Sequence, residues 1–564
     1  MAIPPNSFSP KVDWLQQLTD AYTTFDRTHP KRIKCSNSNK TTHAFWSFFE
    51  PLLSAYALEI EQELAKLSIR HGFTLIETGG LTPFLEPAVE KISLMAERAF
   101  VLELRVAKQA GELKEGTPTE RFDHFFAQLK QPEQALAFFE LYPILGRMAC
   151  VVCENWKNYF LEIMSNIYED LRELKAKIPP LSKIHILTAV NALLTDGAQT
   201  GGRSVAILTF NDALKIVYKP RDSAMDVAYG QFLVWFNAQN IVPPIRHATI
   251  LSRPNHSWCE FVAPNEEMTP AQLPIMYTKL GALLCLMYLF DTIDMHTENL
   301  IVVGDDLILI DLETWLQPFL PDETRNRSVR QTHLLPNNTN FTPDSFDLEG
   351  LTESDLHNKT WTEHKELVWE NEGTDDMRIV RKRRPVDKNK NSIFIGNQVV
   401  NPADYTRDIV KGFRKTYRHI AAHTTAFLEA TQCFNDKKLR SILRGAKTYD
   451  ALIEDMAHPS NLQDGIVLEQ FLDRLWMGTA DEPYLKSLIG IEKMDLMNLD
   501  NPYFYTYPDS TTLFYNQKPI IEDFFDKSAL TVIQQNIKRM SVSDLEKQVR
   551  IIRQSFAKLR LNYG

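Results

Sequence analysis

The chain has 564 residues, a formal net charge of −10 and a charged fraction of 24%. A chain of this length is too long for one compact core, so we expect two or more domains. The acidic balance argues against nucleic acid as a partner. It also argues against binding to an anionic membrane, and no apolar stretch is long enough to span a bilayer, the longest running from Leu280 to Phe290.

Residues 1–40 are polar and predict an arm without the apolar core of a signal peptide. Six scattered cysteines fit a reducing compartment, so we expect a cytoplasmic protein, with delivery to another cell left open. Cys150 and Cys153 form a lone C-x-x-C in an apolar, helix-like stretch, which indicates buried thiols. No zinc is expected, because a second ligand pair is missing.

Residues 41–180 carry apolar side chains at helical spacing, for example at 45–53 and 99–107, and predict a helical region. Thr117 is expected to cap a helix, with Pro118 at its first position and Glu120 in its first turn. Pro179 and Pro180 mark the end of this region.

Residues 181–320 change character and predict an α+β core. Stretches 204–210 and 214–219 are rich in β-branched and aromatic residues and flank an Asn-Asp pair, which indicates a β-hairpin. Helices are expected over 224–237 and 270–290. Two short strands, 300–303 and 307–310, surround Gly-Asp-Asp at 304–306.

Residues 321–402 are polar and predict long loops around the basic run 381–384, in the place of an activation loop. The favoured interpretation of this run is a solvated loop, and the alternative is that it binds an acidic peptide or a phosphate. Residues 403–564 return to helical spacing.

Phosphoryl transfer needs oxygen ligands for magnesium and a group beside the accepting hydroxyl. Asp294 and Asn299 have the spacing of a kinase catalytic loop, and His296 adds a polar group to it. Asp311 and Glu313 follow a predicted strand, where kinases place a second metal-binding Asp. The stretch from Asp294 to Glu313 therefore predicts a site for ATP and Mg²⁺.

A cation and a backbone cradle for the phosphates are also present. Lys219 ends the strand 214–219 and is the candidate cation. The candidate cradle is a turn ahead of the same hairpin, formed by Gly201, Gly202, Arg203 and Ser204. Each signal is weak alone, but their order and spacing together indicate a kinase-like enzyme.

The same motifs resemble the dehydratase domain of class II lanthipeptide synthetases, the LanM family. The resemblance covers most of the chain from about residue 45. It rests on stretches 102–122, 142–143, 196–208, 216–221, 294–299, 309–314, 328–336, 412–417 and 501–504.

The resemblance implies a bacterial enzyme with a lipid-kinase-like, two-lobed catalytic core and extensive helical additions at both ends. Such enzymes phosphorylate Ser and Thr of a precursor peptide and then eliminate the phosphate. The kinase roles it implies fall on Lys219 for the phosphates, Asp294 and His296 in the catalytic loop, Asn299 and Asp311 for Mg²⁺, and Glu313 in support. The family's zinc-dependent cyclase domain is not expected in this chain.

The elimination positions match less well. Asp196 is present, but the family's His two residues later is Ala198 here. Arg440 matches a family arginine, whereas the Thr that follows it is Ala446, with Thr448 two residues further on. An alanine methyl neither removes a proton nor stabilises a departing phosphate.

We therefore expect an ATP- and Mg²⁺-dependent kinase that modifies Ser or Thr of a peptide or protein and is impaired in elimination. A functional stand-alone dehydratase is the first alternative. A nucleotide-binding pseudoenzyme scaffold and a nucleotidyl transferase are the others, and the substrate itself is open.

Overall fold

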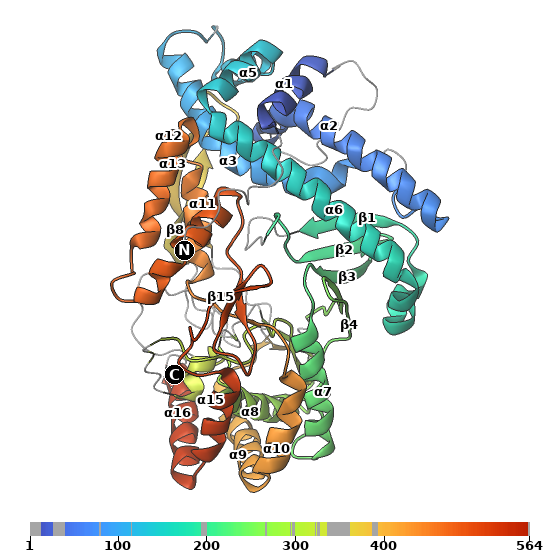
Figure 1. Ribbon diagram of the computed structural model, residues 1–564, viewed down its shortest axis with the longest axis vertical. Helices are drawn as coiled ribbons and strands as arrows, with labels where there is room; N and C mark the ends of the chain where they lie inside the picture. Colours follow the sequence, from blue (N-terminus) through green and yellow to red (C-terminus); the bar gives the residue numbers. More distant parts are fainter. Residues whose placement is uncertain are drawn as a thin grey trace. The chain divides into compact units, whose positions relative to one another are not determined.

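The computed structural model describes residues 13–25, 40–77, 80–113, 115–192, 200–264, 268–293, 295, 299–321, 323, 327–335, 361–385, 393–396 and 398–561. They form an α+β protein, as the sequence predicts, with long helices and small antiparallel sheets (Figure 1). The chain divides into two compact units. The first comprises Met1–Pro220, Leu367–Val380 and Leu443–Pro502, and the second comprises Arg221–Glu366, Arg381–Ile442 and Tyr503–Gly564.

The first unit opens with the expected helical region. Its helices are α1 (Trp14–Thr24), α2 (Lys40–His71), α3 (Thr82–Gln109), α4 (Pro118–Leu129), α5 (Pro132–Leu141) and α6 (Pro143–Lys177), followed by the 3-10 helix η1 (Pro179–Lys183). Proline stands at the start of α3 to α6, where its missing N–H costs no helical hydrogen bond. The capping box predicted at Thr117 and Glu120 is confirmed.

Aromatic rings fill the space between these helices. Phe48 and Phe100 lie 5.0 Å apart between centroids, and Phe138 stacks on Phe100 at 5.1 Å. Cys150 and Cys153 are buried on α6, and burial raises the pKa of the Cys150 thiol to about 12. The interpretation of this pair as buried thiols is confirmed.

The predicted hairpin of the first unit is also confirmed. Strands β1 (Leu187–Ala192), β2 (Ala206–Phe210) and β3 (Leu214–Lys219) pair antiparallel, β2 with both neighbours. Asn211 and Asp212 adopt left-handed φ angles of 49° and 60°, as the turn between β2 and β3 requires. The unit is completed by α11 (Ala446–Met456), α12 (Pro459–Gln463), α13 (Gly465–Phe471), α14 (Ile489–Met497), η6 (Leu472–Trp476) and η7 (Pro483–Ser487).

The second unit is centred on helix α8 (Leu273–Phe290). Around it lie α7 (Ala224–Ala238), α9 (Thr406–Ala422), α10 (Thr424–Ala430), α15 (Ala529–Lys538) and α16 (Val542–Leu561) (Figure 1). In the described part of the chain, α8 is the one helix that by itself is long and apolar enough to cross a membrane, and 89% of it is buried inside the protein. It is a core helix, as expected, but the expectation that no apolar stretch is long enough to span a bilayer is wrong by length, because the helix begins at Leu273 and not at Leu280.

Two glycines allow α8 and α9 to touch backbone to backbone. A Cβ atom on Gly281 would lie 1.9 Å from the carbonyl oxygen of Ile409. A Cβ atom on Gly412 would lie 1.9 Å from the carbonyl oxygen of Thr278. Neither distance is possible for a real side chain, so this crossing requires glycine on both helices.

Short strands complete the second unit. They are β4 (Ile250–Ser252) with β5 (Ser257–Glu260), β6 (Leu300–Val303) with β7 (Asp306–Leu309), β10 (Phe394–Ile395) with β11 (Gln398–Val399), and the sheet β12 (Leu439–Arg440), β13 (Phe504–Thr506), β14 (Leu513–Tyr515) and β15 (Lys518–Ile521). Three 3-10 helices, η2 (Val329–Thr332), η4 (Pro402–Tyr405) and η5 (Thr431–Phe434), lie between them.

Two expectations are wrong. The region 321–402 contains a long hairpin, β8 (Trp361–Glu370) with β9 (Arg378–Pro385), rather than loops alone, and the basic run lies on β9. The C-terminal region carries β12 to β15 besides its helices. The sequences of β8 and β9 have charged residues at both odd and even positions, so they show no apolar alternation. Strands β12 to β15 have only two to four residues each, which is too short for a pattern to be detected. The five consecutive segments proposed as domains stay a prediction.

Replacing Gly281 with Ala should destabilise the protein by about 3 kcal/mol or more, because the added methyl group collides with backbone that side-chain rearrangement cannot move. Thermal and urea unfolding measure the loss. Gly490→Ala in α14 is the matched control, since its Cβ meets nothing within 4 Å. Equal unfolding midpoints for Gly281→Ala and the wild type would contradict the close crossing.

Candidate functional site

The hairpin β6–β7 brings two predicted magnesium ligands to one end. Leu300 pairs with Leu309 in its register, and the N–H of Ile310 donates to the carbonyl oxygen of Asn299 at 3.1 Å. Asn299 and Asp311 therefore flank the same open end of the hairpin, although 12 positions separate them in the sequence. The sequence order of catalytic loop, strand, turn, strand and carboxylate produces this neighbourhood directly.

The opposite end of the same hairpin carries a different pair of acids. Asp305 and Asp306 lie at the turn, and the buried ammonium of Lys279 on α8 binds both, at 3.1 and 2.7 Å. The turn is thus tied to the core helix. This contact holds the turn of the hairpin, while the predicted site lies at the opposite, open end.

Asp311 and Glu313 are compensated by two arginines. Arg221 Nη2 lies 2.9 Å from Asp311 Oδ1 and 3.1 Å from Glu313 Oε2. Arg440 on β12 forms an ion pair with Glu313 Oε1, and its backbone N–H donates to the Glu313 carbonyl oxygen at 3.0 Å. The guanidinium of Arg440 also lies over the ring of Tyr503, 5.6 Å from its centroid.

Burial and neighbouring charges shift the pKa values of Arg221 and Tyr503. Burial lowers the pKa of the Arg221 guanidinium, but Glu313 and Asp311 more than offset this, and the pKa lies above its usual value. Burial raises the pKa of the Tyr503 phenol, and the Glu313 carboxylate adds to the rise. The cluster therefore places two guanidinium groups against the carboxyl groups of Asp311 and Glu313.

The donor set fits a magnesium ion. Asn299 and Asp311 offer an amide and a carboxylate oxygen, the ligands that Mg²⁺ prefers. Glu313 Oε2 is buried and has no hydrogen-bond partner among the described residues, although Arg221 lies within ion-pair distance. A cation at this end would share these carboxylates with Arg221. No group of three His, Cys, Asp or Glu side chains in the described part of the chain forms a further metal site.

Lys219 ends β3 in the first unit, and its side chain is buried. It follows Tyr218, whose hydroxyl donates to Glu162 Oε1 at 2.8 Å and accepts from Asn166 at 2.8 Å. The end of β3 is therefore held rigidly against α6, and the role of Lys219 toward phosphate stays a prediction.

The Gly201–Gly202 turn already binds an anion, which is the chain's own Asp500. Asp500 Oδ2 accepts from the N–H of Gly201 and Oδ1 from the N–H of Gly202, each at 2.7 Å. Both glycines have left-handed φ angles, 78° and 69°, which point their N–H groups the same way. A phosphate at this turn would compete with Asp500 for the two N–H groups. The phosphate cradle therefore stays a prediction, and it requires that Asp500 move away from the turn.

Asp500 is itself enclosed by positive charge. Burial raises its pKa to about 6, while the two amides, Lys91 and Arg203 lower it. Lys91 is buried, and its ammonium donates to the carbonyl oxygen of Leu499 at 3.2 Å. Arg203 and Ser204 complete the turn: Arg203 donates to Thr200 O at 2.9 Å, and the carbonyl oxygen of Ser204 accepts from Tyr159.

Several predicted residues lie outside the described residues. They are Asp196, Ala198, Asp294 and His296. Ala446 opens α11, and its side chain is outside the description as well. Sequence reasoning missed Arg221, Tyr503 and Asp500 as site residues. The first two stand inside the quoted motifs 216–221 and 501–504, whereas nothing local marks Asp500 as the partner of Gly201.

The fold and these motifs define a LanM-like protein. A family model described as a domain of unknown function, DUF4135, matches residues 142–507, and the chain belongs to that family. It is also similar to the lacticin 481/lactococcin biosynthesis protein LcnDR2 of Lactococcus lactis subsp. lactis, with 25% identity over 494 residues. That match covers 81% of this chain and 50% of the relative, so the chain spans about half of the relative's length. The resemblance found in the sequence is confirmed.

Replacing Asp500 with Asn should change how stability depends on pH. The pKa of Asp500 is raised on folding, so its contribution to stability is full below the unfolded pKa, near 4, and is lost as the pH rises through 6. The free energy of unfolding of the wild type, relative to Asp500→Asn, should fall by up to roughly 3 kcal/mol over this window. Urea unfolding from about pH 4 to 7 measures it, since Lys91 stays protonated there. A difference that is flat with pH would contradict the burial of an ionised Asp500.

Proposed function

We propose that the protein transfers the terminal phosphate of ATP, with Mg²⁺, to Ser or Thr hydroxyls of a peptide or protein, and leaves the phosphate in place. The observation that carries the proposal is the common end of β6–β7 shared by Asn299 and Asp311. Membership of a family with a relative named for lacticin 481 and lactococcin biosynthesis supports a peptide as substrate.

The proposed roles follow from the chemistry of the side chains. Magnesium, when bound, neutralises charge on the phosphates and aligns them. Asn299 and Asp311 would hold it. Asp294 would orient the accepting hydroxyl and take its proton, with His296 beside it, and Lys219 would contact the phosphates.

Arg221 has a defined part in this scheme. Its guanidinium neutralises Asp311 and Glu313 together, at 2.9 and 3.1 Å, which keeps two nearby carboxylates from repelling each other. When a cation joins Asp311, Arg221 retains Glu313 as a partner. The carboxylate pair can therefore accept a cation without leaving a buried guanidinium uncompensated.

Impaired elimination rests on two residues, Ala198 and Ala446. Elimination needs a base for the α proton and a positive group for the departing phosphate. Ala198 stands where the family has His and offers neither. Arg440 is the remaining candidate cation, and its charge is already paired with Glu313.

Asp311→Asn should lower phosphate transfer roughly 100-fold or more, because it removes the carboxylate that pairs with Asn299 in the proposed Mg²⁺ site. The assay follows ATP labelled separately on the terminal and on the α phosphate, with a Ser- and Thr-containing peptide encoded by a neighbouring gene. Asp305→Asn is the matched control, since it makes the same change at the other end of the hairpin, where Asp306 still binds Lys279. Transfer of the label only from the α phosphate would mean nucleotidyl transfer, and no turnover in the wild type would mean a pseudoenzyme.

Intact mass of the product tests the second half of the proposal. The wild type should yield a peptide that has gained phosphate and has not lost water. Ala198→His with Ala446→Thr should restore some water loss, because a ring nitrogen and a hydroxyl return to the elimination positions. A wild-type product that has lost water, without a stable phosphate adduct, overturns impaired elimination and favours a functional dehydratase.

A further inference from the structure

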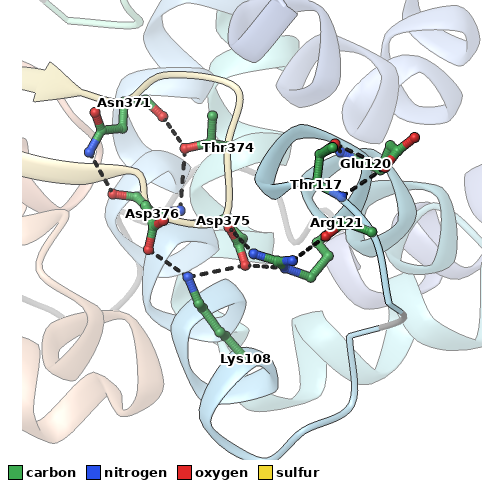
Figure 2. A network of polar contacts seen from close by, with 9 residues as sticks. Lys108, Thr117, Glu120, Arg121, Asn371, Thr374, Asp375 and Asp376 are labelled. Atoms are coloured by element: carbon green, nitrogen blue, oxygen red, sulfur yellow. Dashed lines mark hydrogen bonds and ion pairs between the residues drawn. The ribbon is translucent and has the colours of Figure 1, made fainter.

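The tip of the hairpin β8–β9 belongs to the first unit and is fastened to the helices of that unit. Asp375, in the tip, has a fully buried carboxylate that accepts from Arg121 Nε at 2.6 Å and Nη2 at 3.2 Å. Lys108 Nζ on α3 lies 3.1 Å from Asp375 Oδ2 and 2.5 Å from Asp376 Oδ1 (Figure 2). Two cations thus hold one buried carboxylate.

The anchor on the helical side is equally well fixed. Arg121 is in the first turn of α4, directly after the capping box of Thr117 and Glu120 (Figure 2). The N–H of Asp375 also donates to the carbonyl oxygen of Pro118 at 3.0 Å. The motif 117–122 therefore positions Arg121 to bind the hairpin tip.

Beyond the tip, β9 carries the basic run. Arg378 is neutralised by Glu370 across the hairpin, at 2.8 Å. Arg381, Lys382 and Arg383 are exposed. Among the described residues, Arg381 and Arg383 have no carboxylate partner, in a chain whose net charge is −10.

The geometry of a strand sets the spacing of these charges. Side chains alternate along β9, so Arg381 and Arg383 point to one side, about 6.6 Å apart. Within the described residues β9 pairs with β8 alone, which leaves its outer edge to accept another strand. An extended peptide on that edge would place every second side chain beside these arginines.

We propose that β9 is a docking edge for an extended peptide segment with carboxylates at alternate positions, and that the Arg121–Asp375–Lys108 anchor holds the tip of the hairpin in place. A peptide is the occupant because backbone N–H and C=O groups of an edge are matched by another peptide backbone. Nucleic acid has no backbone N–H and C=O groups at strand spacing, and the acidic chain repels a long polyanion. That the docked segment belongs to the substrate rests on the proposed function, whereas the docking itself does not.

Binding is tested by fluorescence anisotropy without ATP, so the result is independent of catalysis. Three peptides of equal charge are compared: glutamates at alternate positions, glutamates in one block, and the alternating peptide with N-methylated backbone amides. The alternating peptide should bind best. Methylation should weaken it 10-fold or more, since it removes the strand hydrogen bonds. Equal binding of all three overturns the docking edge.

Variants locate the site on β9. Arg381→Glu with Arg383→Glu should weaken binding of the alternating peptide at least 10-fold. Arg378→Gln is the matched control on the same strand and should change it less than twofold, because Glu370 already neutralises Arg378. Asp375→Asn should weaken binding and speed hydrogen exchange in the hairpin. Circular dichroism checks that each variant is folded.

Other outcomes decide against the proposal. An equal loss for Arg378→Gln and for the double variant would mean charge attraction without a defined edge. Stronger binding of a single-stranded RNA, or of vesicles with anionic lipid, to the same arginines would assign the patch to those partners. If the alternating peptide binds as expected but the ATP assay shows no transfer, the docking edge stands and the proposed function fails.

Discussion

The pairing of Glu313 with Arg221 and Arg440 organises the second unit's candidate site. Two carboxylates two residues apart, Asp311 and Glu313, repel each other unless positive charge lies close. Arg221 comes from the chain just after β3 and Arg440 from β12, so the pair joins segments that lie far apart in the sequence. An arginine left without its carboxylate here would be costly, because each is largely shielded from solvent. The site's geometry therefore depends on the two ion pairs that Glu313 makes.

Two pairs of glycines in the chain have different partners. At Gly201 and Gly202 the backbone amides are satisfied by Asp500 from a distant segment. At Gly281 and Gly412 the glycines serve packing alone, since they let two helices meet without side chains. A glycine permits backbone conformations and close contacts that other residues do not. Whether it binds an anion or packs against a helix depends on the segment that lies next to it.

Local patterns in the sequence predicted many of the structural elements correctly. The capping box at Thr117, the hairpin turn at Asn211 and the strands around Gly304 depend on residues a few positions apart, and the structure contains all three. The same holds for Asn299 and Asp311, whose neighbourhood follows from one short hairpin. The strands β12 to β15 were missed because each is too short for a periodic pattern and pairs with segments far away. Asp500 was missed for the same reason, since nothing near it in the sequence indicates Gly201. The roles of Asp294, His296 and Asp196 still rest on the sequence alone.

Helix α8 has a consequence for how the protein is made. Helix α8 is predominantly apolar and is 89% buried in the finished fold, yet its glycine-bearing partner α9 begins only at Thr406. During synthesis α8 therefore leaves the ribosome long before the surface that covers it exists. For that interval it presents an apolar segment that resembles a membrane span to chaperones and to the insertion machinery. Slow translation of the segment between α8 and α9 would prolong this exposure, and a chaperone that binds nascent chains would shorten it.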